Sequence, residues 1–210
     1  MAEKPIIQTF LRLYAVQESG AIRMGMIMEI ETERLRLRQW RASDFVTFAQ
    51  INADPEVMKY FPRVMSMAES NEFARKLQAL ISDRGWGLWA VEERQSGVFI
   101  GFVGLHESPT ELSFSPCIEI GWRLGTAHWG RGYAVEAARA ALKHAFVDLG
   151  FAEVCSFTSA INYRSRAVME RINMVNTNQN FLYPSIPLGS PLSEHVLYKI
   201  TKVLWKDDAA

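Results

Sequence analysis

The sequence predicts an α+β fold built as one domain, and three observations lead to this prediction. With 210 residues the chain can bury one substantial core, whereas a second full domain would be cramped. Segments with strand patterns outnumber helical segments before residue 130, which argues against a regular alternation of strands and helices. The sequence contains no internal repeat and no low-complexity tract.

Residues 1–28 differ from the rest of the chain. The run IIQTFLRLYAV is apolar at roughly helical spacing. Gln8, Thr9 and Arg12 interrupt the continuous apolar stretch that a signal peptide requires. We expect this segment to be an arm that docks on the body or on a partner, or to precede the natural start.

The pattern after the arm predicts a strand followed by a helix. RLRLRQW (34–40) alternates polar and apolar residues at period two, as a half-buried strand does. Ser43 and Asp44 can cap a helix that runs to about Asn52. The following NADPEVMKYFP, which contains two prolines, predicts a short helical connection.

A long helix and an antiparallel hairpin come next. SMAESNEFARKLQALISDRG opens with Ser66 and Glu69 at the spacing of a capping box, and Gly85 stands where a C-terminal cap belongs. The apolar runs WGLWAVEE and VFIGFVGLHE, joined by RQSG, predict the two strands of the hairpin.

The second half of the chain predicts three further strands and two helices. CIEIGWRL, EVCSFTS and HVLYKITKVLW have strand patterns, and NYRSRAVMERI predicts a short helix. The other helix ends at Gly150. Its apolar stripe consists of Val135, Ala138, Leu142, Ala145, Phe146 and Leu149.

Charge and composition argue against several classes of partner. Basic and acidic residues number 23 each, so nothing suggests nucleic acid or a membrane surface as a partner. No apolar run approaches the roughly 18 residues of a membrane span. Cys117 and Cys155 stand far apart in apolar runs, which predicts buried thiols rather than a metal site or a disulfide. These features predict a reduced, cytoplasmic protein.

A glycine-containing turn precedes the alanine-rich helix in HWGRGYAVEAARAAL (128–142). A strand, a turn with Gly130 and Gly132, and a helix N-terminus can hold pyrophosphate, because unpaired N–H groups lie there. A plain tight turn is the alternative. A P-loop is excluded because no Gly-Lys-Ser/Thr follows, and a dinucleotide fingerprint fails because Val135 occupies its third glycine position.

The segment WGRGYA resembles the acyl-coenzyme-A loop, Gln/Arg-x-x-Gly-x-Gly/Ala, of the GNAT superfamily of N-acetyltransferases. Trp129 stands at the Gln/Arg position, Gly132 at the glycine and Ala134 at the last small residue. TERLRLRQWRASD, NADPEVMKYFP, IEIGWRLGTAHWGRGYAVEA and NYRSRAVMERINM, in this order, resemble the branch that includes ribosomal-protein-alanine N-acetyltransferases. The resemblance covers about residues 31–203 and departs at Trp129 and at Asn173, where that branch usually has glycine.

The resemblance implies an acetyltransferase domain over residues 29–210 that uses acetyl-CoA as co-substrate and no metal. A mostly antiparallel central sheet, flanked by helices, would splay between its fourth and fifth strands, and pantetheine would lie in that cleft as an extra strand does. The implied cofactor-binding residues are Trp122, Leu124, Trp129, Gly130, Arg131, Gly132, Tyr133, Ala134 and Asn162.

The implied chemistry is attack of a neutral amine on the thioester carbonyl, without an acyl-enzyme. Glu119 is the candidate base, and it would act through a water or with a raised pKa, because a glutamate with a pKa of about 4.3 is a weak base toward an ammonium. Ser165 and Tyr163 are the candidate acids for the departing thiolate. The alternatives are an outward-facing Glu119 and an Asn162 that only caps a helix.

The acceptor implied by the resemblance is a primary amine, and a protein N-terminal α-amine is the leading expectation. His106 and Glu107 either line the acceptor side or belong to the polar surface, and His128 is expected to be structural. A homodimer is compatible with the resemblance. Two other classes stay open. A solvent-facing Glu119, with no alternative base, would favour a non-catalytic acyl-CoA sensor. A parallel sheet with the glycine turn after its first strand would favour a dinucleotide-binding oxidoreductase.

Overall fold

The computed structural model describes residues 8–18 and 21–205, with side chains from residue 28 onwards. Its strands are β1 (Gln8–Glu18), β2 (Ala21–Glu31), β3 (Leu35–Arg38), β4 (Leu88–Glu93), β5 (Phe99–Glu107), β6 (Ile118–Leu124), β7 (Glu153–Ser159), β8 (Val175–Asn176), β9 (Phe181–Leu182) and β10 (Glu194–Thr201). Its α-helices are α1 (Asp44–Ala53), α2 (Met67–Arg84), α3 (Tyr133–Lys143) and α4 (Tyr163–Arg171), and a π-helical turn, His144–Asp148, extends α3.

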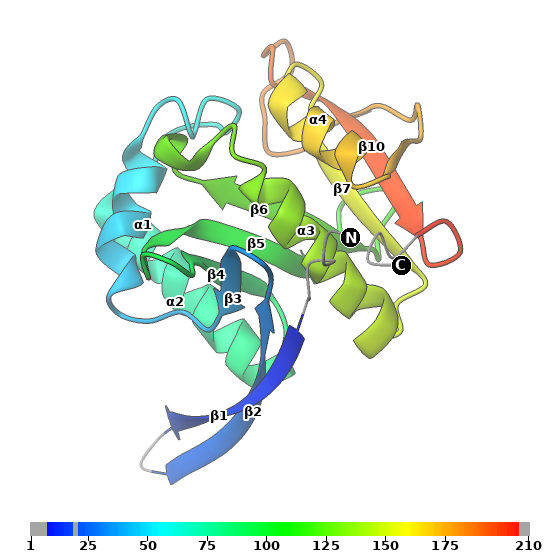
Figure 1. The fold of residues 1–210 in the computed structure, drawn as a ribbon. Helices are drawn as coiled ribbons and strands as arrows, with labels where there is room; N and C mark the ends of the chain where they lie inside the picture. The colour runs from blue at the N-terminus through cyan, green and yellow to red at the C-terminus, as the bar shows by residue number, and fades with distance from the viewer. Residues whose placement is uncertain (1–7, 19–20, 206–210) are drawn as a thin grey trace.

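The strands form one sheet in the order β1-β2-β3-β4-β5-β6-β7-β10-β8, with β9 paired to β10 (Figure 1). Pairing is antiparallel throughout the described strands except between β6 and β7, which are parallel. The predicted α+β class and the mostly antiparallel sheet are therefore confirmed.

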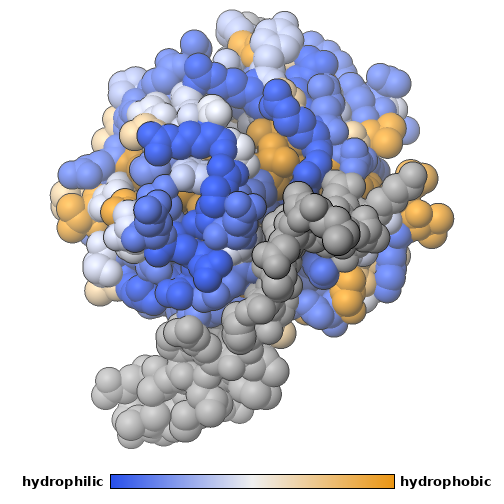
Figure 2. Space-filling view, in the orientation of Figure 1, coloured by the Kyte–Doolittle hydropathy of each residue, from blue (hydrophilic) through white to orange (hydrophobic). Residues whose placement is uncertain are grey.

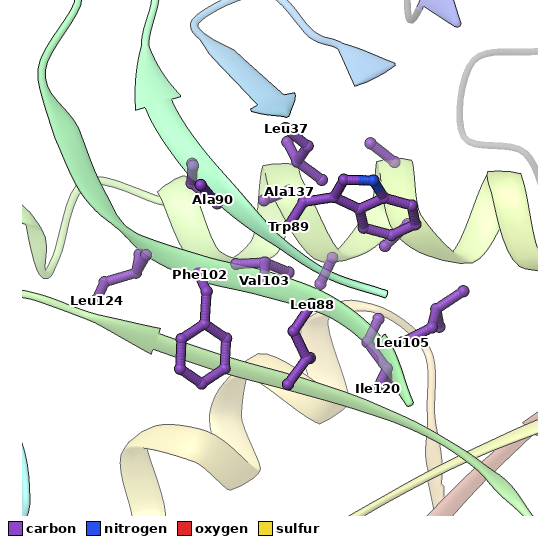
Figure 3. Close-up of a cluster of buried hydrophobic side chains, with 14 of the residues drawn as sticks. Leu37, Leu88, Trp89, Ala90, Phe102, Val103, Leu105, Ile120, Leu124 and Ala137 are labelled. Carbon is purple, nitrogen blue, oxygen red and sulfur yellow. The ribbon is translucent and has the colours of Figure 1, made fainter. Parts of the chain in front are cut away.

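The core fills both faces of the central strands. Figure 3 shows Trp89 and Ala137 on one side of these strands and Leu88 and Phe102 on the other. The alanine-rich face of α3 packs on the first side, and small side chains let the helix approach the sheet closely. On the second side, under α1 and α2, Trp40 and Phe48 lie edge to face with ring centroids 4.8 Å apart.

The ends of α2 follow the sequence prediction. The Ser66 hydroxyl accepts from the backbone N–H of Glu69, and the Glu69 carboxylate accepts from the backbone N–H of Ser66. Gly85 ends the helix in the left-handed conformation, with φ of +79°. Asn173 is left-handed as well, with φ of +63°, so asparagine replaces the expected glycine without a change of backbone.

The predicted cap of α1 is wrong in its chemistry. Ser43 makes no side-chain cap bond. Instead the Asp44 carboxylate accepts from the backbone N–H of Arg41 at 2.8 Å and takes two bonds of 2.8 Å from Arg38. Arg38 also donates to Glu92, so this buried arginine has two carboxylate partners.

Two local predictions failed. The run IIQTFLRLYAV has roughly helical spacing, but its residues 8–16 lie in β1, which pairs with β2 along its whole length. Its first two residues lie outside the described part of the chain. A short apolar run does not by itself distinguish a helix from a strand. The NADPEVMKYFP segment forms turns rather than a helix, with one bond of helical i, i+4 spacing, from Met58 N to Asp54 O. The β1–β2 hairpin projects from the body in Figure 1.

The sheet opens between β6 and β7. Their parallel pairing is recorded at one position, Glu119 opposite Cys155, and the Ser156 hydroxyl donates to the Ile120 carbonyl at 2.9 Å. Beyond this point β6 continues to pair with β5, and β7 continues to pair with β10. These are the fourth and fifth of the strands predicted from residue 34 onwards, so the predicted splay is confirmed.

Candidate functional site

A cleft of about 1580 Å³ occupies the space between the splayed strands. It extends from the turn before α3 and the N-terminus of α4 to side chains of α2 and of the segment around β9. In the view of Figure 2 the molecular surface is mostly polar, and an apolar area is exposed within it between α3 and α4. The cleft is large enough for an extended ligand.

The glycine turn presents backbone N–H groups at one end of this cleft. Gly132 is the N-cap of α3 with φ of +79°, and Gly130 has φ of +73°. No side chain of the described residues caps this helix end. Its first N–H groups therefore remain available for an anion, and the helix dipole adds partial positive charge there. Gly130, Gly132, Tyr133 and Ala134 all line the cleft.

Arg34, the residue before β3, contacts both the turn and the first turn of α3. Its Nη1 donates to the Arg131 carbonyl at 3.0 Å, and its Nη2 lies 2.6 Å from Glu136 in the first turn of α3. Its guanidinium carbon lies 4.8 Å from the centre of the Tyr133 ring, and the Tyr133 hydroxyl donates to Glu93. Sequence reasoning missed this support, because Arg34 is far from the turn in the chain.

Two residues of the predicted loop have other contacts. The Trp129 indole donates to the Leu124 carbonyl at 2.8 Å, so Trp129 ties the loop to the end of β6. The Arg164 guanidinium lies 4.5 Å from the Trp129 ring centre. Arg131 is exposed and is not among the residues that line the cleft. The structure thus gathers the predicted cofactor residues at the cleft, apart from the Arg131 side chain.

The outer edge of β6 borders the cleft beyond Ile120. Trp122 and Leu124 both line it. This part of the strand pairs with β5 on one side and has no strand partner toward β7 among the described residues. An extended chain could therefore bind along this edge as an added strand does.

The N-terminus of α4 lies across the cleft from β6. The Asn162 side chain accepts from the backbone N–H of Ser165, so Asn162 caps this helix, and it also lines the cleft. Asn162 Nδ2 also donates to the Ser165 hydroxyl at 3.1 Å, which leaves the hydroxyl proton free to be donated elsewhere. Ser165 is half-buried, whereas Tyr163 is exposed, and both line the cleft.

Glu119 is buried and faces His106 across the β5–β6 pair. The two residues are register partners, and Nε2 of His106 lies 3.2 Å from Oε2 of Glu119. Nδ1 of His106 lies 3.0 Å from the Glu107 carbonyl. Burial disfavours the imidazolium, but the Glu119 carboxylate and the Glu107 carbonyl outweigh it, so the pKa of His106 is raised. Both ring nitrogens face oxygen acceptors, which suits the protonated form.

Sequence reasoning placed Glu119 and His106 separately and gave no reason to pair them. The signal was present in the hairpin register, since equal spacing from the β5–β6 turn makes them cross-strand neighbours. Glu107 is exposed and interacts with Arg84 instead. Cys155 is buried as predicted, whereas Cys117 is only half-buried, and both thiols are free.

A parallel pair of diverging strands, a glycine turn at the N-terminus of α3 and a cleft between the strands form the arrangement that the resemblance to acyl-CoA-dependent acetyltransferases implies. The family model described as "Acetyltransferase (GNAT) domain" matches residues 34–175. The chain belongs to the GNAT acetyltransferase family.

Individual relatives agree with this assignment. The chain is 32% identical over 152 residues to the uncharacterized protein YkkB of Bacillus subtilis. The match covers 72% of this chain and 87% of YkkB. It is 35% identical over 164 residues to an FsC-acetyl coenzyme A-N(2)-transacetylase of Aspergillus fumigatus. The match covers 74% of this chain and 68% of that protein. A GNAT-family acetyltransferase from Bacillus anthracis has a similar structure, with TM-score 0.70 and 26% identity, over 84% of this chain and 99% of that one.

The remaining alternatives are less well supported. The glycine turn follows β6 of a mostly antiparallel sheet, which is not the arrangement of a dinucleotide-binding oxidoreductase. Glu119 is buried at the cleft, whereas the sensor hypothesis called for a solvent-facing Glu119. Within residues 8–18 and 21–205, no helix is long and apolar enough to cross a membrane, and no cluster of His, Cys, Asp and Glu could hold a metal ion.

Proposed function

We propose that the protein transfers an acetyl group from acetyl-CoA directly to a primary amine. The observation that carries this proposal is the position of the buried Glu119–His106 pair at the cleft, close to where β6 and β7 diverge. The acceptor nitrogen forms a bond to the thioester carbonyl carbon, and the carbon–sulfur bond breaks. The products are the N-acetylated amine and CoA, and one proton passes from the amine to the departing thiolate.

Three parts of the chain would position acetyl-CoA. The N–H groups of residues 130–134 would bind the pyrophosphate, and the edge of β6 near Trp122 and Leu124 would bind the pantetheine. A backbone N–H near Trp122 would stabilise the oxyanion, as donors fixed in place before the reaction do. The Leu124 carbonyl accepts from the Trp129 indole, so Trp129 would act by fixing the loop to this edge.

Glu119 and His106 would act as one base. With the imidazole neutral, the pair can take up a proton between Nε2 of His106 and Oε2 of Glu119. The raised pKa of His106 brings the pair closer to the pKa of an amine than an ordinary glutamate is. Ser165, whose hydroxyl proton is free, is the better-placed acid for the thiolate, and the exposed Tyr163 is the alternative.

The acceptor is an α-amine in this proposal, with a protein N-terminus as the first candidate. Two observations support an amine acceptor. The name of the Aspergillus fumigatus relative describes an acetyl-coenzyme-A N-transacetylase. When the His106 imidazole is neutral, the buried Glu119 carboxylate also provides negative charge at the place where an ammonium would arrive.

Ligand binding followed by turnover tests the proposal. Thermal unfolding with acetyl-CoA at a hundred times its dissociation constant should show about 2.7 kcal/mol of added stability, and NAD should add none. Release of CoA thiol is then measured with a panel of primary amines. Binding without thiol release with any amine would favour the acyl-CoA sensor, and stabilisation by NAD would favour the oxidoreductase.

A further inference from the structure

Arg123 lies on β6 on the same face as Glu119, since alternate residues of a strand share a face. Its Nη1 donates to the Asn52 side-chain oxygen at 2.7 Å. Its guanidinium carbon lies 4.3 Å from the ring centre of Phe61 and 5.4 Å from that of Phe102. The side chain lines the cleft on the side of α1 and α2, opposite to the face on which α3 packs.

Arg123 has no acidic partner among the described residues, and its buried Nε has no hydrogen-bond acceptor. Burial lowers the pKa of Arg123 to about 10, so the guanidinium remains charged at pH 7. Arg38 is the internal comparison. It is buried between Asp44 and Glu92, and its pKa is raised. Burial of an uncompensated charge is unfavourable, and the aromatic rings offset only part of that cost.

The space beside Arg123 is open toward Glu119. Gly121 separates the two residues on their common face, and a Cβ atom there would meet only His106 Nε2 at 3.8 Å and Leu88 Cδ2 at 4.0 Å. Along this face of β6 the cleft surface therefore has a carboxylate–imidazole pair at Glu119, a gap at Gly121, and a guanidinium without an acidic partner at Arg123. A ligand that carries an amine and an anion would match this order of charges.

We propose that Arg123 binds a carboxylate of the acceptor, so that the preferred substrates are amines that carry a carboxylate. A planar carboxylate accepts two parallel N–H bonds from a guanidinium, and its single negative charge balances the single charge of Arg123. The carboxylate comes from a free amino acid or from an acidic side chain at a peptide N-terminus. This inference rests on the proposed acetyl transfer, and it disfavours acceptors that carry amines alone.

Matched acceptor pairs test the inference in the wild-type protein. Leucine is compared with leucinamide, and a peptide amide that begins with glutamate is compared with one that begins with glutamine, all with saturating acetyl-CoA. We expect kcat/KM for the carboxylate to exceed that for the amide by about 10- to 100-fold in at least one pair, as for loss of a charge-assisted bond. The pair that shows the preference identifies the source of the carboxylate. Equal rates within both pairs would overturn the inference.

Variants assign the preference to Arg123. Arg123→Met should abolish the preference for the carboxylate and keep the binding of acetyl-CoA, and Arg123→Lys should keep part of the preference. Arg75→Met is the matched control, because Arg75 also lies over a phenylalanine ring but is exposed and does not line the cleft. A carboxylate preference that persists in a folded Arg123→Met variant would overturn the assignment. If acetyl-CoA binds and no amine of either kind is acetylated, the proposed transfer itself fails.

Discussion

At the scale of single residues, Glu119 carries the most weight in the proposed chemistry. Its position on β6 fixes it opposite His106, and the strand pairing buries it at the cleft. A glutamate at this position could equally have faced outward, since a strand pattern alone does not say which face is covered. Because Glu119 is buried at the cleft, it does not face outward into solvent.

Glu119→Gln should slow acetyl transfer much more than it weakens acetyl-CoA binding, because glutamine keeps the size and cannot take up the proton. At pH 7 an α-amine is neutral in roughly a tenth of molecules and a lysine side chain in fewer than about one in a thousand. We expect a loss of about 10²- to 10⁴-fold with a lysine-like acceptor and a smaller loss with an α-amine. Steady-state kinetics and acetyl-CoA titration measure both effects.

Glu107→Gln is the control for this substitution, because Glu107 is exposed at the end of β5 and interacts with Arg84. It should leave kcat/KM unchanged. Equal rates for wild type and Glu119→Gln with the best acceptor between pH 6 and 9 would mean that Glu119 is not the base.

The titration of His106 should depend on Glu119. Because the carboxylate raises the pKa of His106, we expect NMR to give a value above 6.5 in the wild type and a lower value in Glu119→Gln. The direction in which the stability of the folded protein changes with pH follows from the raised pKa of His106. The pair contributes its full stabilisation below about pH 6.5, and this contribution is lost as the pH rises through the raised pKa of the folded state.

His128 provides the internal control, since burial lowers its pKa and Glu119 is not among the causes. Its titration should be the same in both proteins. An unchanged pKa of His106 in Glu119→Gln would contradict the pairing of these two side chains.

At the scale of elements, the sequence predicted most of the helices and strands of the body, because caps and periodicity are local signals. The capping box at Ser66 and Glu69 is an example. The partners that complete the site come from register and tertiary contact. Arg34 reaches the Arg131 carbonyl across the fold, and His106 reaches Glu119 across two strands. No spacing within one segment reveals such contacts, so these residues could not be assigned from pattern alone.

The turn before α3 allows a direct test. Gly132→Val should fold and lose acetyl-CoA binding, because a branched side chain would occupy the approach to the N–H groups. A Cβ at this position meets only Arg34 Nη2, at 3.5 Å, so the interior tolerates the change. The left-handed backbone at φ of +79° costs a non-glycine residue about 1–2 kcal/mol. Isothermal titration with acetyl-CoA, alongside thermal unfolding, measures both effects.

Gly97→Val is the matched control, because Gly97 has φ of +69°, has open space around its Cβ position, and lies outside the cleft. It should lose comparable stability and bind acetyl-CoA as the wild type does. Unchanged affinity in a folded Gly132→Val variant would show that the turn has no role in cofactor binding.

At the scale of the whole molecule, the β1–β2 hairpin is joined to the body by little pairing. The recorded register between β2 and β3 consists of Ile30 opposite Leu37 and Glu31 opposite Arg36. The family match begins at residue 34, beyond the hairpin. Met28 is attached to the body, because its carbonyl accepts a hydrogen bond of 3.0 Å from the Trp89 indole.

Deletion of residues 1–26 should therefore leave acetyl transfer unchanged. The truncated chain keeps Met28 and the pairing of β2 with β3. Steady-state kinetics with acetyl-CoA and the best acceptor, together with the elution volume in gel filtration, provide the measurement. A truncated protein that binds acetyl-CoA and acetylates no amine would place the arm in the acceptor site or in a required dimer.

The opening of the sheet between β6 and β7 bears on how substrates enter the cleft and how products leave it. The glycine turn belongs to the face of the sheet that α3 covers, whereas Glu119, His106 and Arg123 belong to the face of α1 and α2. In the proposed reaction acetyl-CoA therefore enters from the face that α3 covers, and the acceptor amine enters from the face of α1 and α2. The two substrates meet in the gap between β6 and β7. The acetylated product and CoA would then be released from opposite faces of the sheet, and the release of one would not require prior release of the other.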